Sequence, residues 1–197
     1  MKYRNVTIFS GQSFSVPEGI QRLDHRATHG WQLRYGPSKM FSDHSNDGSG
    51  AEAALAVAIA ELARRIAKLP APSGLQRRAS ANKTNDLPVG ISGPIIRRRN
   101  DQAVRECSFG VSLPRFGAEP RKRSIYIGNE NTYTPEKYEA ALAKAIELRE
   151  AAERAYEVAA TRAKRAEGRT LVVANQSARL RTAPAGAAKR GAGARAK

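Results

Sequence analysis

The chain has 197 residues, of which 34 are Lys or Arg and 18 are Asp or Glu, so its formal net charge is +16. Hydrophobic residues make up 41% and aromatic residues 6% of the chain, which suffices for one ordinary domain or two small ones. The lone Cys107 excludes a disulfide framework and a zinc site built from several cysteines. A polyanion is the expected partner of a chain this basic.

The sequence offers no segment suited to a membrane. Its longest apolar run, around Ala51–Ala60, is interrupted by Glu52 and is too short to span a bilayer. Met1–Ser10 has early charges and no apolar stretch, so we expect no secretory signal. We therefore expect a cytoplasmic protein, associated with the nucleoid, that has no membrane partner.

In the first half, three short strand-like segments precede a helix. Gly19-Ile20 opens the first segment, residues 31–35 alternate apolar with polar side chains, and Met40-Phe41 forms the third. The Ala-rich segment 52–66 then repeats its large apolar residues at helical spacing. This order predicts a three-stranded antiparallel sheet covered by one helix.

Residues 70–87 are rich in Pro, Ser, Asn and Gly and predict a linker. The same order of segments then recurs, with Gly90-Ile91, an alternating stretch at 109–113, Ile125–Ile127 and a helix that starts at Thr134-Pro135. The helical pattern continues to about residue 165, which is longer than a three-stranded sheet requires. The overhang would pack on the first half or on a second chain as a homodimer, and the pattern leaves both open.

An octapeptide connects the two halves. Residues 52–59 match residues 139–146 at seven of eight positions, and each octapeptide follows the same order of strand-like segments. We therefore predict an α+β fold of two small repeats, each a three-stranded antiparallel sheet packed on one α-helix. The first repeat would span residues 1–69 and the second residues 88–167.

Residues 168–197 hold seven basic residues and no acidic one. Leu171–Val173 would either pair as a short strand or pack back on the domain, and the Ala, Gly, Arg and Lys residues that follow from Asn175 predict a disordered tail. Such a tail either binds phosphates without sequence preference or serves solubility alone.

The rest of the charge is also localised. Residues 71–137 hold twelve basic and six acidic residues, whereas residues 138–167, most of the second helix, hold six of each. Because a helix covers the apolar face of its sheet, we expect the basic side chains on the opposite face.

Three groups of residues resemble a known pattern: Gly30-Trp31-Gln32-Leu33-Arg34, Met40-Phe41-Ser42, and the Ala-rich helix from Glu52. They look like the DNA-binding domain of the Apetala-two and ethylene-response-factor family, which has prokaryotic relatives in phage and mobile-element proteins. Residues 88–150 resemble the same domain, with Phe109 in the position of Trp31. The resemblance implies a three-stranded sheet that lies in the DNA major groove and contacts it through Arg and Trp side chains.

The resemblance, together with the clusters of basic residues, gives the candidate nucleic-acid contacts. They are Arg22, Trp31, Arg34, Lys39, Arg97, Arg98, Arg99, Arg115, Arg121, Lys122, Arg123, Lys189 and Arg190. We expect no metal or cofactor, because His25, His29 and His44 lack the further ligands that a metal site requires. No nucleophile–base pair or carboxylate pair stands out, so we do not expect an enzyme.

The leading hypothesis is a double-stranded DNA-binding protein, either a transcriptional regulator or an accessory factor, in which a basic sheet face binds the major groove. An RNA- or ribosome-associated protein that uses the same face is the first alternative. A scaffold protein that dimerises through its second helix is the second.

Overall fold

The chain divides into two compact units. A computed structural model describes residues 1–26, 28–79, 81–98 and 104–182, with side chains as far as residue 171. Unit 1 combines Met1–Leu69 with the end of the last helix from Arg165, and unit 2 comprises Pro70–Lys164. The fold is α+β, with three antiparallel sheets and two helices in the described residues.

Unit 1 begins with a hairpin that the sequence analysis did not predict. Strands β1 (Tyr3–Thr7) and β2 (Ser13–Pro17) pair in antiparallel register, from Tyr3 opposite Pro17 to Thr7 opposite Ser13. Val16 is fully buried, and the Phe14 ring meets Trp31 edge-on with the ring centroids 5.7 Å apart. The hairpin therefore belongs to the core. The prediction of two sheets was wrong, because this hairpin forms an additional sheet.

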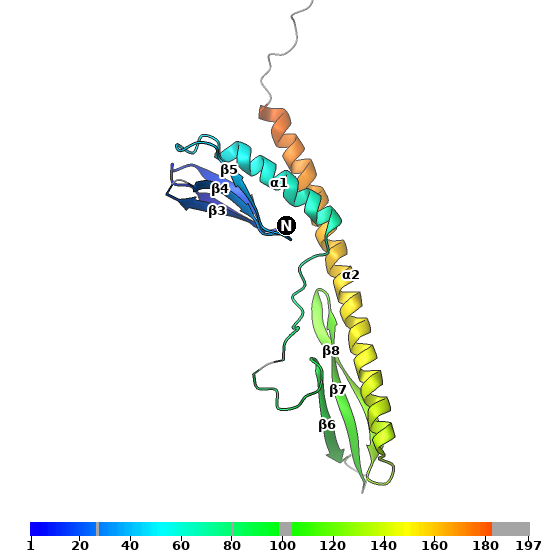
Figure 1. Cartoon of the computed structure of the whole chain (residues 1–197). Coiled ribbons are helices and arrows are strands. Elements are labelled where there is room, and N and C mark those ends of the chain that lie inside the picture. The colour runs from blue at the N-terminus through cyan, green and yellow to red at the C-terminus, as the bar shows by residue number, and fades with distance from the viewer. Residues whose placement is uncertain (27, 80, 99–103, 183–197) are drawn as a thin grey trace, which may run out of the picture. The chain divides into compact units, whose positions relative to one another are not determined.

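The second sheet of unit 1 follows the predicted order of elements. It consists of β3 (Ile20–His25), β4 (Thr28–Leu33) and β5 (Lys39–Ser42), and helix α1 (Ala51–Lys68) packs against it (Figure 1). Alternation along β4 turns Trp31 and Leu33 toward Leu62 and the other buried residues of α1. One face of this sheet is therefore buried in the core.

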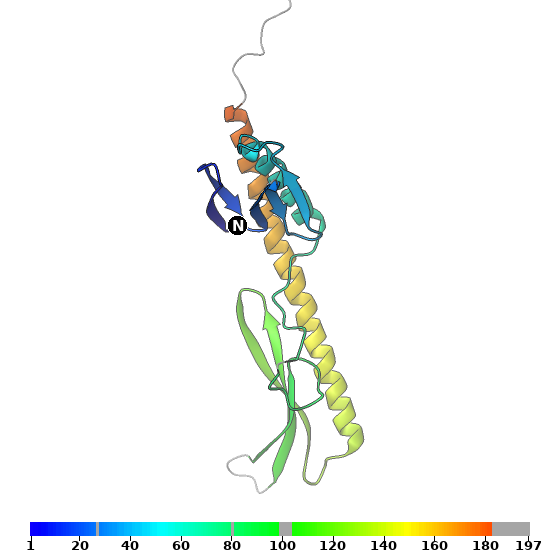
Figure 2. The ribbon, with the colours of Figure 1, turned by 60° about the vertical axis from the view of Figure 1, so that its left-hand side comes forward.

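Unit 2 is built from longer strands. They are β6 (Ile91–Arg98), β7 (Arg105–Arg115) and β8 (Ala118–Asn129), in that order across the sheet. Both views show helix α2 (Pro135–Thr182) running along the sheet (Figures 1 and 2). Phe109, Val111 and Ile125 are buried against Ala141 and Ala145 of this helix. The short alanine side chains let the helix lie close to the sheet.

Two predicted signals at the ends of α2 had different outcomes. The start at Thr134 is confirmed, because its Oγ1 accepts a hydrogen bond from the Lys137 backbone N–H at 3.3 Å. The predicted end near residue 165 and the reading of Leu171–Val173 as a strand were wrong, since α2 continues to Thr182. The last part of the tail, residues 183–197, lies outside the described residues. No helix in the described ranges is both long and apolar enough to cross a membrane.

Gly168 of α2 has a packing role. A Cβ atom at Gly168 would lie 2.7 Å from Cγ2 of Ile66 on α1, so only glycine permits this approach. One turn later, Leu171 is 2% exposed and belongs to the core of unit 1. The end of α2 is therefore part of unit 1 and not of a separate tail.

The linker between the halves belongs to unit 2. Residues 70–87 contain no helix or strand where the structure describes them, as predicted. The Ala71 N–H nevertheless donates to Thr161 Oγ1 at 3.1 Å, and Arg77 forms ion pairs with Glu153 and Glu157 of α2. The predicted boundaries at 87 and 167 therefore differ from those of the observed units.

The role of Leu171 is testable by truncation. Leu171→Ala should reduce the free energy of unfolding of unit 1 by about 2–5 kcal/mol, as for other large-to-small core substitutions. The measurement is urea unfolding followed by the fluorescence of Trp31, the single tryptophan, which lies in unit 1. Val158→Ala, at a position on α2 that is 69% exposed, is the control. Equal stability of the two variants would contradict the packing of Leu171 in this core.

Candidate nucleic-acid interface

The β6–β8 sheet has one face free of helix. Large apolar side chains of β7 point to α2, so the residues between them, Ser108, Gly110 and Ser112, lie on the opposite face. Their partners in register on β8 are Tyr126, Ser124 and Lys122. On the other side of β7, Ser92 pairs with Gly110, and its Oγ donates a hydrogen bond to the Gly110 carbonyl at 3.2 Å. This face therefore carries mostly small polar residues.

Small side chains make this face concave. The concavity has a volume of about 570 Å³ and includes Ser92, Ile95, Arg97, Ser108, Gly110, Ser112, Lys122 and Ser124 in its lining, and we call these eight residues the open face. Arg97 pairs in register with Glu106, while Lys122 pairs with Ser112, six residues further along β7. At roughly 3.4 Å per residue, the two backbone positions are about 20 Å apart along the strand. A cation thus stands toward each end of a shallow, uncharged floor.

Several arginines of the helices and the linker form ion pairs, whereas the two cations of the open face do not. Arg64 and Arg65 pair with Glu61, Arg77 pairs with Glu153 and Glu157, and Arg149 pairs with Glu153. In the part of the chain that the structure describes, no acidic side chain forms an ion pair with the following strand residues: Arg97, Arg115, Arg121, Lys122 and Arg123. Their charge is available to an external anion.

Strand alternation divides the two predicted basic clusters. Lys122 lies on the open face, whereas Arg121 and Arg123 pair in register with Leu113 and Val111 and alternate toward the other side, although Arg123 also borders the concavity. Arg97 lies on the open face and Arg98 alternates away from it, opposite Arg105. The expectation that each cluster lies together on one face was wrong, because successive side chains of a strand point to opposite faces. Arg99, Lys189 and Arg190 lie outside the described residues.

Arg115 has a different position from the other basic residues. It pairs with Ala118 at the turn between β7 and β8, where it is exposed. Beside it, the Phe116 ring packs edge-on against Tyr156 of α2 with the centroids 5.7 Å apart. This contact attaches the tip of the hairpin to the helix and leaves Arg115 at the end of the sheet.

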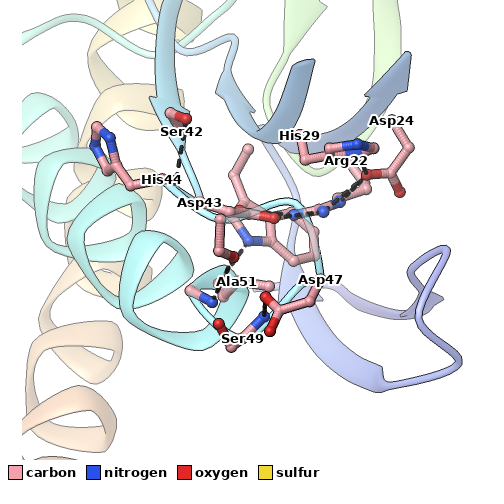
Figure 3. Close-up of polar contacts among 12 residues, drawn as sticks. Arg22, Asp24, His29, Ser42, Asp43, His44, Asp47, Ser49 and Ala51 are labelled. Carbon is pink, nitrogen blue, oxygen red and sulfur yellow. Dashed lines mark hydrogen bonds and ion pairs between the residues drawn. The ribbon is translucent and has the colours of Figure 1, made fainter. Parts of the chain in front are cut away.

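Arg22 is a structural residue and not a free contact. Its guanidinium donates hydrogen bonds to the two carboxylate oxygens of Asp43 at 2.9 and 2.6 Å, and to Asp24 at 2.9 Å (Figure 3). It also lies 5.0 Å from the centre of the Trp31 ring. The side chain of Arg22 is only 6% exposed and that of Asp43 is fully buried. The prediction that Arg22 contacts nucleic acid was wrong, since its register with Trp31 turns it toward α1.

The ionisation of this cluster follows from its hydrogen bonds. Burial alone would lower the pKa of Arg22, but its bonds to Asp43 and Asp24 outweigh burial and raise that pKa. Burial likewise acts to raise the pKa of Asp24, and hydrogen bonds from Arg22 and His29 overcome it and lower that pKa. The charges of Arg22 and Asp24 are thus fixed by each other.

Trp31 is a core residue. It is 0% exposed, and its indole Nε1–H donates to the Ala51 carbonyl at 2.8 Å, at the first residue of α1. The prediction of Trp31 as a contact was wrong, because the alternation that defines β4 points this side chain into the core. Phe109 is also 0% exposed, and it meets Tyr138 edge-on at 5.1 Å.

The remaining predicted contacts of unit 1, Arg34 and Lys39, are exposed, and Arg34 lines a concavity with Lys2 and Arg4. Arg34 donates from Nε to Gln32 Oε1 at 2.8 Å, and Lys39 lies 5.2 Å from the centre of the Phe41 ring. The face of the β3–β5 sheet away from α1 carries Gln21, Leu23, Gln32 and Met40 by register.

No family model, curated protein or solved structure matches this chain. Among the described residues, no three His, Cys, Asp or Glu side chains are grouped so that they could hold a metal ion. The chemistry of the open face therefore has to be judged from its own residues.

Most uncharged residues of the open face were not predicted from the sequence. Ser92, Ser108, Gly110 and Ser124 line it, and none was proposed as a site residue. A signal was present, since Ser108, Gly110 and Ser112 occupy every second position of an otherwise apolar strand. Small residues in this pattern indicate a face that another molecule approaches closely.

The structural role of Arg22 leads to a stability prediction. Arg22→Ala should cost about 3–5 kcal/mol of unfolding free energy, because it leaves the buried Asp43 carboxylate unpaired. Removing the acid as well, in Arg22→Ala with Asp43→Ala, should recover part of the loss. Arg34→Ala, an exposed position, is the control and should change stability by no more than about 0.5 kcal/mol. Urea unfolding followed by Trp31 fluorescence measures all three, and equal effects of Arg22→Ala and Arg34→Ala would contradict the assignment.

Proposed function

We propose that this chain is a non-enzymatic double-stranded DNA-binding protein, a transcriptional regulator or accessory factor, and that the open face of the β6–β8 sheet enters the major groove. One observation carries the proposal. Arg97 and Lys122 stand on a concave, small-residue sheet face and form no ion pair with the described acidic residues.

The dimensions of the groove support this use of the sheet. The major groove of B-DNA is about 12 Å wide and admits a β-ribbon, so the β7–β8 hairpin fits it. Ser92, Ser108 and Ser124 supply hydroxyl groups that both donate and accept hydrogen bonds at base edges. Arg97 has the fork geometry that reads guanine through two hydrogen bonds. Lys122 would add a point charge at the other end of the face.

The basic residues around the open face would supply affinity without sequence information. Arg115, Arg121 and Arg123 are exposed at or near the β7–β8 turn and would contact phosphates. Lys189 and Arg190 would add a phosphate-binding arm.

The resemblance to the Apetala-two and ethylene-response-factor family remains part of the proposal, as does an internal duplication. Two corresponding positions support the duplication. Gly19 and Gly90 both have positive φ, of 97° and 84°, just before the first strand of a three-stranded sheet. Their carbonyls accept hydrogen bonds from the backbone N–H groups of Arg34 and Ser112, at 2.7 and 2.8 Å. We propose that the first copy has kept the fold, while the second binds DNA.

A double variant of the open face tests the proposal. Arg97→Ala with Lys122→Ala should lower the affinity for a preferred duplex about tenfold or more at 0.1 M salt, because it removes a two-bond contact to a base, worth about 1–3 kcal/mol, together with one further positive charge. If Arg97 reads a base, preference at one position should also relax by about 1–3 kcal/mol. The measurement is fluorescence anisotropy with a duplex selected from random sequences, over a range of salt.

The matched control is Arg154→Gln with Arg162→Gln, which removes the same charge from exposed positions of α2. Equal losses in the two double variants would contradict a role for the open face. Structured RNA and single-stranded DNA are the competing probes. Tighter binding to RNA than to the selected duplex would favour the RNA-associated alternative and overturn the proposal.

A further inference from the structure

A second concavity lies between β8 and the start of α2. Its volume is about 380 Å³, and its lining consists of Arg123, Ser124, Ile125, Tyr126, Ile127, Lys137, Ala140, Ala141 and Lys144. We call it the β8–α2 cleft. Three of these residues are cations and none is acidic, although Glu136, Glu139 and Glu147 lie on the same stretch of helix.

The fold explains this separation of charge. Lys137, Ala140, Ala141 and Lys144 follow the spacing i, i+3, i+4, i+7 and so share one face of α2. The glutamates occupy other positions around the helix. Lys137 Nζ donates to the Thr132 carbonyl at 2.7 Å, and within the described residues neither Lys137 nor Lys144 forms an ion pair. The cations of the cleft are therefore not neutralised by the helix that carries them.

The wall of the cleft is an edge strand. β8 is the last strand of its sheet, so alternate backbone N–H groups of β8 point away from β7. Short side chains at Ala140 and Ala141 keep the floor between strand and helix open. The cleft thus combines three cations, which bind phosphate oxygens, with an edge strand that presents backbone N–H groups between its carbonyls.

We propose that the β8–α2 cleft binds the phosphodiester backbone of the same DNA duplex whose base edges contact the open face. This inference rests on the proposed function. Arg123 and Ser124 border both concavities, so the two surfaces adjoin along β8. When a sheet occupies the major groove, the phosphates of the flanking strands lie at its edges, and the cleft is at one such edge.

The test is Lys137→Gln with Lys144→Gln in the full chain, compared with the control Arg154→Gln with Arg162→Gln. The cleft variant should bind the selected duplex at least about tenfold more weakly at 0.1 M salt, and the slope of log affinity against log salt should fall by about 2. The ratio of affinities for selected and random duplexes should stay the same, because phosphates carry no sequence information. Circular dichroism checks that α2 is retained.

The outcomes separate the two proposals. If the open-face variant loses binding and the cleft variant behaves like the control, the cleft inference is overturned and the proposed function stands. A changed ratio of selected to random affinity in the cleft variant would also overturn it, since the cleft would then contact bases. Failure of the wild-type chain to bind either duplex would overturn both proposals.

Discussion

The packing of the β6–β8 sheet on the alanine face of α2 is the contact on which the candidate site depends. Phe109, Val111 and Ile125 are buried against Ala141 and Ala145. Because neighbouring residues of a strand alternate, committing one face to the helix fixes which residues lie on the other. The position of Arg97 and Lys122 on the open face, and of Arg121 off it, follows from this one constraint.

The two units show how one arrangement of sheet and helix can have different surfaces. In unit 1 the arginine beside the central aromatic residue, Arg22, is bound by Asp24 and Asp43 and so links β3 to the residue that follows β5. In unit 2, Arg105 of β7 pairs with Glu130, whereas Arg97 and Lys122 of the open face form no ion pair among the described residues. The positions of the acidic residues, more than those of the basic ones, therefore decide which basic side chains have a structural role and which are available to an external anion.

Much of the fold could be predicted from the sequence, because alternation and helical spacing are local signals. The strands around Trp31 and Phe109 and the helices after them were found in this way. The β1–β2 hairpin was missed because its burial depends on contacts with Trp31 that no local pattern records. The continuation of α2 past Gly168 was missed because that glycine meets Ile66 of another helix. The same reason applies to Arg22, whose partner Asp43 is 21 residues away.

Nuclear magnetic resonance mapping of the duplex-binding surface tests most directly whether the open face binds DNA. A selected duplex is titrated into the ¹⁵N-labelled full chain, and the backbone amide shifts are followed. If the open face binds the duplex, the largest shift changes will fall on Ser108, Gly110 and Ser124 of the open face, with smaller changes at Lys144 in the β8–α2 cleft. Largest changes on the β3–β5 sheet, around Gln32 and Met40, would contradict it.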